Sequence, residues 1–191
     1  MLNNIREFKL NKLENPKYIK SSLVSFLQND IKKSWEIVSA HDSVAILIYH
    51  KTKKRFILVK QFRPPVYMHN QDGITVELCA GLVDKDKTLV EIAQEEILEE
   101  CGYKVELDNI SKVTSYRVDL GHSGNKQTLY YCEVDDNMKV SDGGGVDMEL
   151  IEVIEMDIKQ MQEMIFNENI ANAPSLNFAF YWWMSKQKLY G

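Results

Sequence analysis

The sequence has little that would place the protein in a membrane, on nucleic acid or outside a reducing compartment. No apolar run reaches the roughly 18 residues that a membrane-spanning helix requires, and residues 1–18 contain no apolar core of the signal-peptide kind. The formal net charge of -5 argues against a general affinity for nucleic acid or anionic membrane. The three cysteines are odd in number and lack metal-ligand spacing, so we expect reduced thiols and a cytoplasmic protein.

Length and pattern predict one domain with a short N-terminal extension. The 191 residues suit a single domain, and a hydrophobic content of 45% can support a buried core. β-rich runs predict strands at 23–27, 35–38, 43–49, 56–62, 74–78, 113–118, 128–134 and 150–156, whereas helical patterns occur at 88–103, 158–166 and 174–186. Because strands and helices interleave irregularly, the fold class is α+β or mixed α/β.

The predicted helix at 88–103 contains five glutamates and no Lys or Arg. Apolar Val90, Ala93 and Ile97 recur at helical spacing, and Glu96 and Glu100 then share a face. Like charges four residues apart destabilise a helix by roughly 0.2–0.5 kcal/mol per pair. A hard divalent cation such as Mg²⁺ could supply the missing positive charge. On composition alone, a solvated acidic face is an equally good interpretation.

The spacing of this segment matches a known motif. Five residues stand at fixed positions of the Nudix box, G-x5-E-x7-R-E-U-x-E-E-x-G-U with U a bulky apolar residue, and these are Gly81, Glu96, Glu99, Glu100 and Gly102. The chain therefore resembles the Nudix hydrolases. The resemblance implies an α/β/α sandwich with a mixed central sheet at 41–191, preceded by a dimerising β region at 1–40. Lys87 and Glu95 depart from the pattern, which puts the internal support of the box in doubt more than the metal site.

The likeness extends over roughly residues 33–186 and is greatest to the ADP-ribose and UDP-sugar pyrophosphatase branch. The segments CAGLVD (79–84), EECGY (99–103) and KQT (126–128) are most similar to UDP-glucose pyrophosphatases. ADP-ribose enzymes of the branch usually carry Ser-Pro-Gly after the box, but this chain has no proline between Pro65 and Pro174. The resemblance thus implies hydrolysis of a nucleotide sugar of the UDP-glucose type to a nucleoside monophosphate and a sugar 1-phosphate.

Three alternatives stay open. The first is an ADP-ribose pyrophosphatase that gives AMP and ribose 5-phosphate. The second is a Nudix module that binds a nucleotide without hydrolysing it, and the departures from the box at Lys87 and Glu95 would indicate this loss of activity. The third is a structural domain with an acidic interaction helix, although this would not explain the spacing from Gly81 to Glu100.

By resemblance, Glu96 and Glu100 are the main metal ligands, with support from Glu99 and the Ala80 carbonyl. The expected ion is Mg²⁺, with Mn²⁺ as a possible substitute, because carboxylates that hold such ions can position water and neutralise phosphate charge. For Glu99 the alternative is an exposed helix carboxylate.

A base must also orient or deprotonate the attacking water. The glycine-containing loop at 141–149 offers Glu149 and Asp147, and we favour Glu149 narrowly; both could instead be solvated loop acids.

Three residues are candidates for the substrate. Arg63 can contact a phosphate with its planar fork of donors, or it forms a surface salt bridge. By resemblance, Trp35 would stack on the nucleobase and, in the expected homodimer, would reach the partner's site; the alternative is that it fills a core or dimer interface. Glu77 binds a metal or Arg63.

Overall fold

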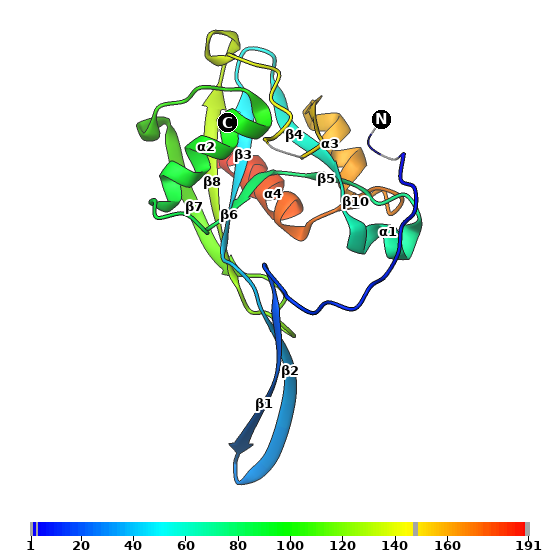
Figure 1. Cartoon of the computed structure of the whole chain (residues 1–191). Helices are drawn as coiled ribbons and strands as arrows, with labels where there is room; N and C mark the ends of the chain where they lie inside the picture. The colour runs from blue at the N-terminus through cyan, green and yellow to red at the C-terminus, as the bar shows by residue number, and fades with distance from the viewer. Residues whose placement is uncertain (1, 3, 147–148, 190–191) are drawn as a thin grey trace.

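The computed structural model describes residues 2, 4–146 and 149–189, and most of its strands form one mixed sheet (Figure 1). This eight-stranded sheet has the order β10-β5-β4-β3-β8-β7, with β6 paired to β3 and β9 paired to β4. Its strands are β3 (Ser43–His50), β4 (Arg55–Phe62), β5 (Ile74–Glu77), β6 (Cys79–Leu82), β7 (Ile110–Arg117), β8 (Lys126–Val134), β9 (Ile151–Met156) and β10 (Ala171–Asn172). The pairing of β3 with β8 is parallel and that with β4 is antiparallel, so the sheet is mixed.

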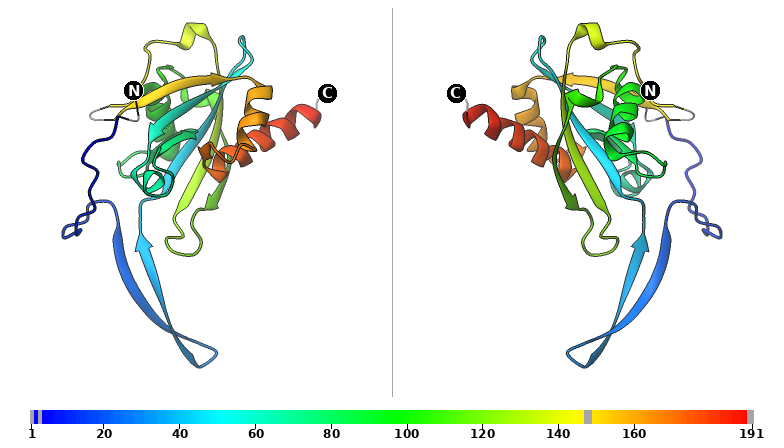
Figure 2. Two further views of the ribbon diagram at one scale, coloured as in Figure 1. Left: turned by 90° about the vertical axis from the view of Figure 1, so that its right-hand side faces the viewer. Right: turned by 90° about the vertical axis from the view of Figure 1, so that its left-hand side faces the viewer.

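Helices cover both faces of this sheet. Helix α2 (Leu89–Cys101) lies on one side, while α3 (Ile158–Ile165) and α4 (Pro174–Leu189) lie on the other, as the two views of Figure 2 show. Alternate residues of a strand point to opposite faces. Accordingly Val44 and Ile46 of β3 belong to the core beneath α2, whereas Ala45 and Leu47 belong to the core beneath α3 and α4. The predicted α/β/α sandwich is confirmed.

The structure contains short elements that the sequence patterns did not predict. These are strands β6 and β10, the helix α1 (Pro64–Asn70) and two 3-10 turns at Leu107–Asn109 and Asp136–Met138. Pro64 ends β4, as expected, but it also opens α1, because the first position of a helix needs no backbone N–H. Among the described helices, none is long and apolar enough to cross a bilayer.

Strands β1 (Lys20–Gln28) and β2 (Ile31–Ser39) form a separate antiparallel hairpin that projects from the body (Figure 1). Its tight turn places Asn29 and Asp30 at φ 51° and 62°, a conformation that Asn and Asp tolerate and that suits the twist of a hairpin. At its base, the Val38 N–H donates to the His122 carbonyl at 3.0 Å. The β7–β8 loop, which carries His122, therefore contacts the base of the hairpin.

Candidate active site

Helix α2 has a defined start and end, which fix the direction of its acidic side chains. Thr88 and Glu91 form a reciprocal capping box, in which the Thr88 N–H donates to Glu91 Oε2 at 2.8 Å. Gly102 ends the helix at φ 71°, a left-handed conformation that glycine adopts without strain. Between these caps, Glu96 and Glu100 both lie against strand β6.

The two glutamates approach the backbone of β6 closely. Glu100 is 4% exposed, and its Oε2 accepts a hydrogen bond of 3.0 Å from the Ala80 N–H. A Cβ atom at Gly81 would overlap the Glu96 carboxylate, so the absence of a side chain at Gly81 makes room for Glu96. The structure therefore brings together four residues that the sequence singled out.

Both carboxylates are held where ionisation is unfavourable. The pKa of Glu100 is raised to about 8, chiefly by burial and with contributions from the charges of Glu96 and Glu149, which together outweigh the lowering effect of the hydrogen bond from the Ala80 N–H. Burial also raises the pKa of Glu96 to about 7, with an added contribution from Glu99. In the described part of the chain, no lysine, arginine or histidine forms an ion pair with Glu96 or Glu100. A nearby cation would stabilise the ionised forms of both carboxylates.

The donor set fits a divalent cation, although it does not form a complete cage. Across residues 2, 4–146 and 149–189, no three His, Cys, Asp or Glu side chains are already arranged to hold a metal ion. Mg²⁺ is commonly bound by one or two protein carboxylates, with waters and substrate phosphates as its other ligands. The Glu96–Glu100 pair matches that pattern. Glu99 is half-buried beside Glu96, and its charge helps to raise the pKa of Glu96.

The loop after β8 is attached to the C-terminal end of α2. The Gly144 N–H donates to the Glu100 carbonyl at 2.9 Å, and the Gly145 N–H donates to the Glu99 carbonyl at 3.1 Å. Gly145 has φ 83°, and a Cβ atom there would overlap the Glu149 side chain. The loop thus carries Glu149 towards the helix that bears the other carboxylates, and the charge of Glu149 contributes to the raised pKa of Glu100.

Glu149 itself is exposed, and its Oε2 accepts a 3.3 Å hydrogen bond from the Val146 N–H. Asp147, the other candidate base, lies outside the described residues.

Arg63 and Glu77 form a two-point ion pair. Arg63 Nε donates to Glu77 Oε1 at 2.8 Å, and Arg63 Nη2 donates to Oε2 at 2.7 Å. The Thr75 hydroxyl also donates to Oε1 at 2.6 Å. Burial alone would raise the pKa of Glu77, but the hydrogen bonds from Arg63 and Thr75 outweigh it and lower the pKa. Glu77 was expected to bind either a metal or Arg63, and the structure shows the contact with Arg63. Because this contact uses Nε and Nη2, the Nη1 edge of the guanidinium can still donate to another acceptor.

Trp35 lies on β2 of the projecting hairpin, whereas Glu96 and Glu100 lie on α2, which packs on the body of the molecule (Figure 1). Its indole Nε1 donates to the Gly121 carbonyl at 2.7 Å, while 56% of the residue is exposed. Trp35 is therefore not a filler of its own subunit's core.

The two residues that depart from the box pattern contact each other. Lys87 Nζ pairs with Glu95 Oε1, and Lys85 Nζ pairs with Glu95 Oε2 at 3.2 Å. The sequence patterns did not predict the ion pair of Lys85 with Glu95. The position of Lys85, two residues before Lys87 in the same loop, could have indicated it.

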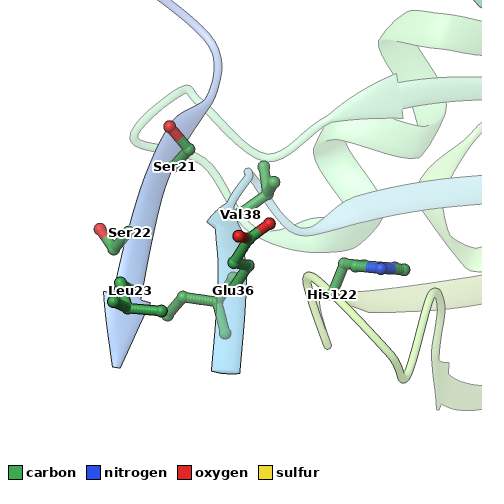
Figure 3. A pocket seen from close by; sticks show the side chains of 7 residues that line it. Ser21, Ser22, Leu23, Glu36, Val38 and His122 are labelled. Carbon is green, nitrogen blue, oxygen red and sulfur yellow. The ribbon is translucent and has the colours of Figure 1, made fainter. Parts of the chain in front are cut away.

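Two cavities lie apart from these carboxylates. One, of about 380 Å³, lies between the hairpin and the β7–β8 loop and includes Ser21, Glu36 and His122 (Figure 3). The other, of about 810 Å³, lies beside the start of α4, where Tyr116 and Phe178 meet edge to face.

Comparison with known proteins relates the chain to enzymes with named substrates. Residues 39–174 match the NUDIX domain. Uridine diphosphate glucose pyrophosphatase NUDT14 of Bos taurus is 32% identical over 197 residues, covering 88% of this chain and 89% of the relative. The Mus musculus protein of the same name is 33% identical over 198 residues, with the same coverage. GDP-mannose pyrophosphatase of Salmonella typhimurium is 34% identical over 147 residues, covering 76% of this chain and 75% of the relative.

Proposed function

The chain belongs to the Nudix family and is a Nudix hydrolase, and from this premise we propose that it splits the diphosphate bond of a nucleotide sugar. The products would be a nucleoside monophosphate and a sugar 1-phosphate, with UDP-glucose as the preferred class of substrate. The observation that carries the proposal is the pair of glutamates, Glu96 and Glu100, pressed against β6 without a basic partner among the described residues. A structural acidic face would leave such carboxylates in water.

Glu96 and Glu100 would hold the metal, with Glu99 and the Ala80 carbonyl in support. The ion would be Mg²⁺, replaceable by Mn²⁺, and when bound it supplies charge neutralisation for the phosphates and a water of lowered pKa. The side chains themselves fix where that happens: Glu100 is held by the Ala80 N–H, and Glu96 lies in the space that Gly81 leaves open.

Glu149 would accept the proton of the attacking water. The hydrogen bonds of Gly144 and Gly145 to the end of α2 support this role, because they attach the loop to the helix that carries the metal ligands. A base must come within hydrogen-bond reach of the proton it takes, and Glu149 would reach it by leaving its contact with the Val146 N–H. Asp147 is the alternative base, by a narrow margin.

Arg63 would bind a phosphate oxygen of the substrate through the Nη1 edge that Glu77 leaves free. Glu77 would then orient the guanidinium and balance its charge before substrate arrives. A positioned, rigid guanidinium loses less freedom on binding than a solvated one, which favours affinity.

We also propose that the protein is a homodimer in which residues 1–40 provide the contact. The hairpin exposes more large apolar side chains than is usual for a stable monomer. These are Leu23, Phe26, Leu27, Ile31 and Trp35. A second subunit would bury them. In such a dimer Trp35 would reach the partner's site and stack on the nucleobase, while Arg63 of that site, oriented by Glu77, would bind the diphosphate.

A second substrate class has a specific observation in its favour. The similarity to GDP-mannose pyrophosphatase of Salmonella typhimurium means that a guanine nucleotide sugar belongs in the same test. The third candidate substrate is ADP-ribose. Discriminating bases needs hydrogen bonds to the base edge, since stacking on Trp35 would accept any of them.

The test is a panel of UDP-glucose, GDP-mannose and ADP-ribose with Mg²⁺, in which the purified protein is assayed by mass spectrometry. Release of UMP and glucose 1-phosphate supports the proposal. Absence of turnover on all three, with binding of any one, would favour the non-catalytic module instead.

The three cysteines of the chain are free and buried, which supports the cytoplasm as the proposed location. Detection of the native protein outside the cytoplasmic fraction would contradict this.

A further inference from the structure

Glu95 binds two lysines of the loop that precedes its own helix. Lys85 Nζ lies 3.2 Å from Glu95 Oε2, and Lys87 Nζ pairs with Oε1 of the same carboxylate. Both lysine side chains are less than half exposed, at 42% and 43%, and that of Glu95 is 28% exposed. One carboxylate in the middle of α2 is thus paired with two ammonium groups of the preceding loop.

Lys85 is also near the neighbouring carboxylates of α2, Glu96 and Glu99. Glu96 follows Glu95 directly on α2, and Glu99 lies one helical turn beyond Glu95 on the same face, so both are neighbours of the carboxylate that binds Lys85. The hydrogen bond to Glu95 raises the pKa of Lys85, and the charges of Glu99 and Glu96 add to this effect. A lysine ammonium on a flexible stem is a mobile point charge. Without its bond to Glu95, the Lys85 ammonium would have Glu96 and Glu99 as its next partners.

We propose that Glu95 is a positioning residue that holds the Lys85 and Lys87 ammonium groups away from Glu96 and Glu99, so that these carboxylates stay open to a divalent cation. This inference rests on the proposed function, because it takes Glu96 and Glu100 as the metal ligands. An ammonium that pairs with Glu96 would have to be displaced before the metal could bind, and that displacement would appear as weaker metal affinity.

The same contact explains how the two departures from the box pattern are compatible. The pattern has an acidic residue at the position of Lys87 and a basic residue at the position of Glu95, and here the two charges are exchanged. In the structure the two exchanged charges pair with each other. The reversal puts a positive charge in the loop, and Glu95 is the group that neutralises it.

A double-mutant cycle on metal binding tests the proposal. The four proteins are wild type, Glu95→Gln, Lys85→Gln and the double variant, and the readout is Mn²⁺ affinity by electron paramagnetic resonance without substrate. Glu95→Gln should weaken binding about tenfold, which corresponds to about 1.4 kcal/mol. Lys85→Gln should recover most of this loss in the Glu95→Gln background, yet change affinity less than about twofold in the wild-type background.

The non-additivity is the decisive feature. A general electrostatic effect would make Lys85→Gln tighten metal binding by the same factor in both backgrounds, and that result would overturn the proposal. Unchanged Mn²⁺ affinity in Glu95→Gln would overturn it as well. A matched charge control is Glu91→Gln, because Gln keeps the capping box and removes one negative charge from the same row of the helix; it should weaken binding less than about twofold.

A second measurement does not depend on the Glu95→Gln protein folding. In Lys85→Gln/Lys87→Gln both ammonium groups are absent, and Mn²⁺ affinity should be at least that of wild type. Weaker binding would mean that the lysines help to form the site, which contradicts the proposal. Activity of the wild-type protein on nucleotide sugars is measured in parallel, so a failure of the proposed function is separate from a failure of this inference.

Discussion

Replacing Glu100 with Gln should move activity and metal-free stability in opposite directions. The amide has the size of the carboxyl group, and its oxygen can still accept the hydrogen bond from the Ala80 N–H. It cannot carry the negative charge that a metal ligand needs. We expect kcat to fall at least about 10²-fold, the scale on which loss of a key electrostatic group acts, or about 2.7 kcal/mol in the barrier.

The stability change follows from burial. The pKa of Glu100 is about 8 in the folded protein against an ordinary value of 4.5, so the folded state retains a proton that the unfolded chain loses. Stability of the metal-free wild type should therefore fall as pH rises from about 4.5 to about 8. At pH 7 this contribution is on the order of 3 kcal/mol. The variant cannot ionise, so metal-free Glu100→Gln should be more stable than wild type at pH 7 and equal to it near pH 4.

Urea unfolding at pH 4 and pH 7, with and without Mg²⁺, measures both effects. Mg²⁺ should stabilise the wild type and not the variant. The surface control is Glu163→Gln on α3, where Glu163 forms an exposed pair with Lys159 at 3.8 Å; it should leave activity and stability nearly unchanged. If metal-free Glu100→Gln is less stable than wild type at pH 7, the burial argument fails. Activity within a factor of a few of wild type would exclude Glu100 as a metal ligand.

Three further predictions concern the base, the subunits and the substrate. Glu149→Gln should lower kcat at least about 10²-fold while Mn²⁺ affinity measured by electron paramagnetic resonance stays within about threefold; a loss of affinity of similar size would make Glu149 a ligand instead. Light scattering at micromolar concentration should give a homodimer, and a fully active monomer would refute that state. The kcat/KM for UDP-glucose should equal or exceed that for ADP-ribose, and a tenfold preference for ADP-ribose, about 1.4 kcal/mol in the transition state, would overturn the UDP-sugar assignment.

The shared face of Glu96 and Glu100 could be predicted because spacing on a helix determines geometry. Once residues 88–103 were assigned to a helix, Glu96 and Glu100 had to share a face, and the structure places both against β6. The same holds for the predicted hairpin of β3 and β4, in which Ile48 pairs with Ile57. Local periodicity carries this information, so a single sequence suffices.

Contacts between distant segments could not be predicted in this way. The attachment of Gly144 to the Glu100 carbonyl joins a loop to a helix more than forty residues earlier, and no local pattern encodes it. In the sequence Lys87 and Glu95 are two separate departures from the box pattern, whereas the structure pairs them. Strand β6 was also missed, because Ala80 and Gly81 have weak strand propensity and gain their place from pairing with Ala45 and Val44.

The most direct test of the account is hydrolysis of UDP-glucose in H₂¹⁸O with Mg²⁺, followed by mass spectrometry of the products. We expect UMP and glucose 1-phosphate, with one ¹⁸O on one of the two phosphates. We also expect no turnover after the metal is removed with EDTA until Mg²⁺ or Mn²⁺ is restored. Undiminished turnover in EDTA, or UDP and free glucose as the products, would contradict it.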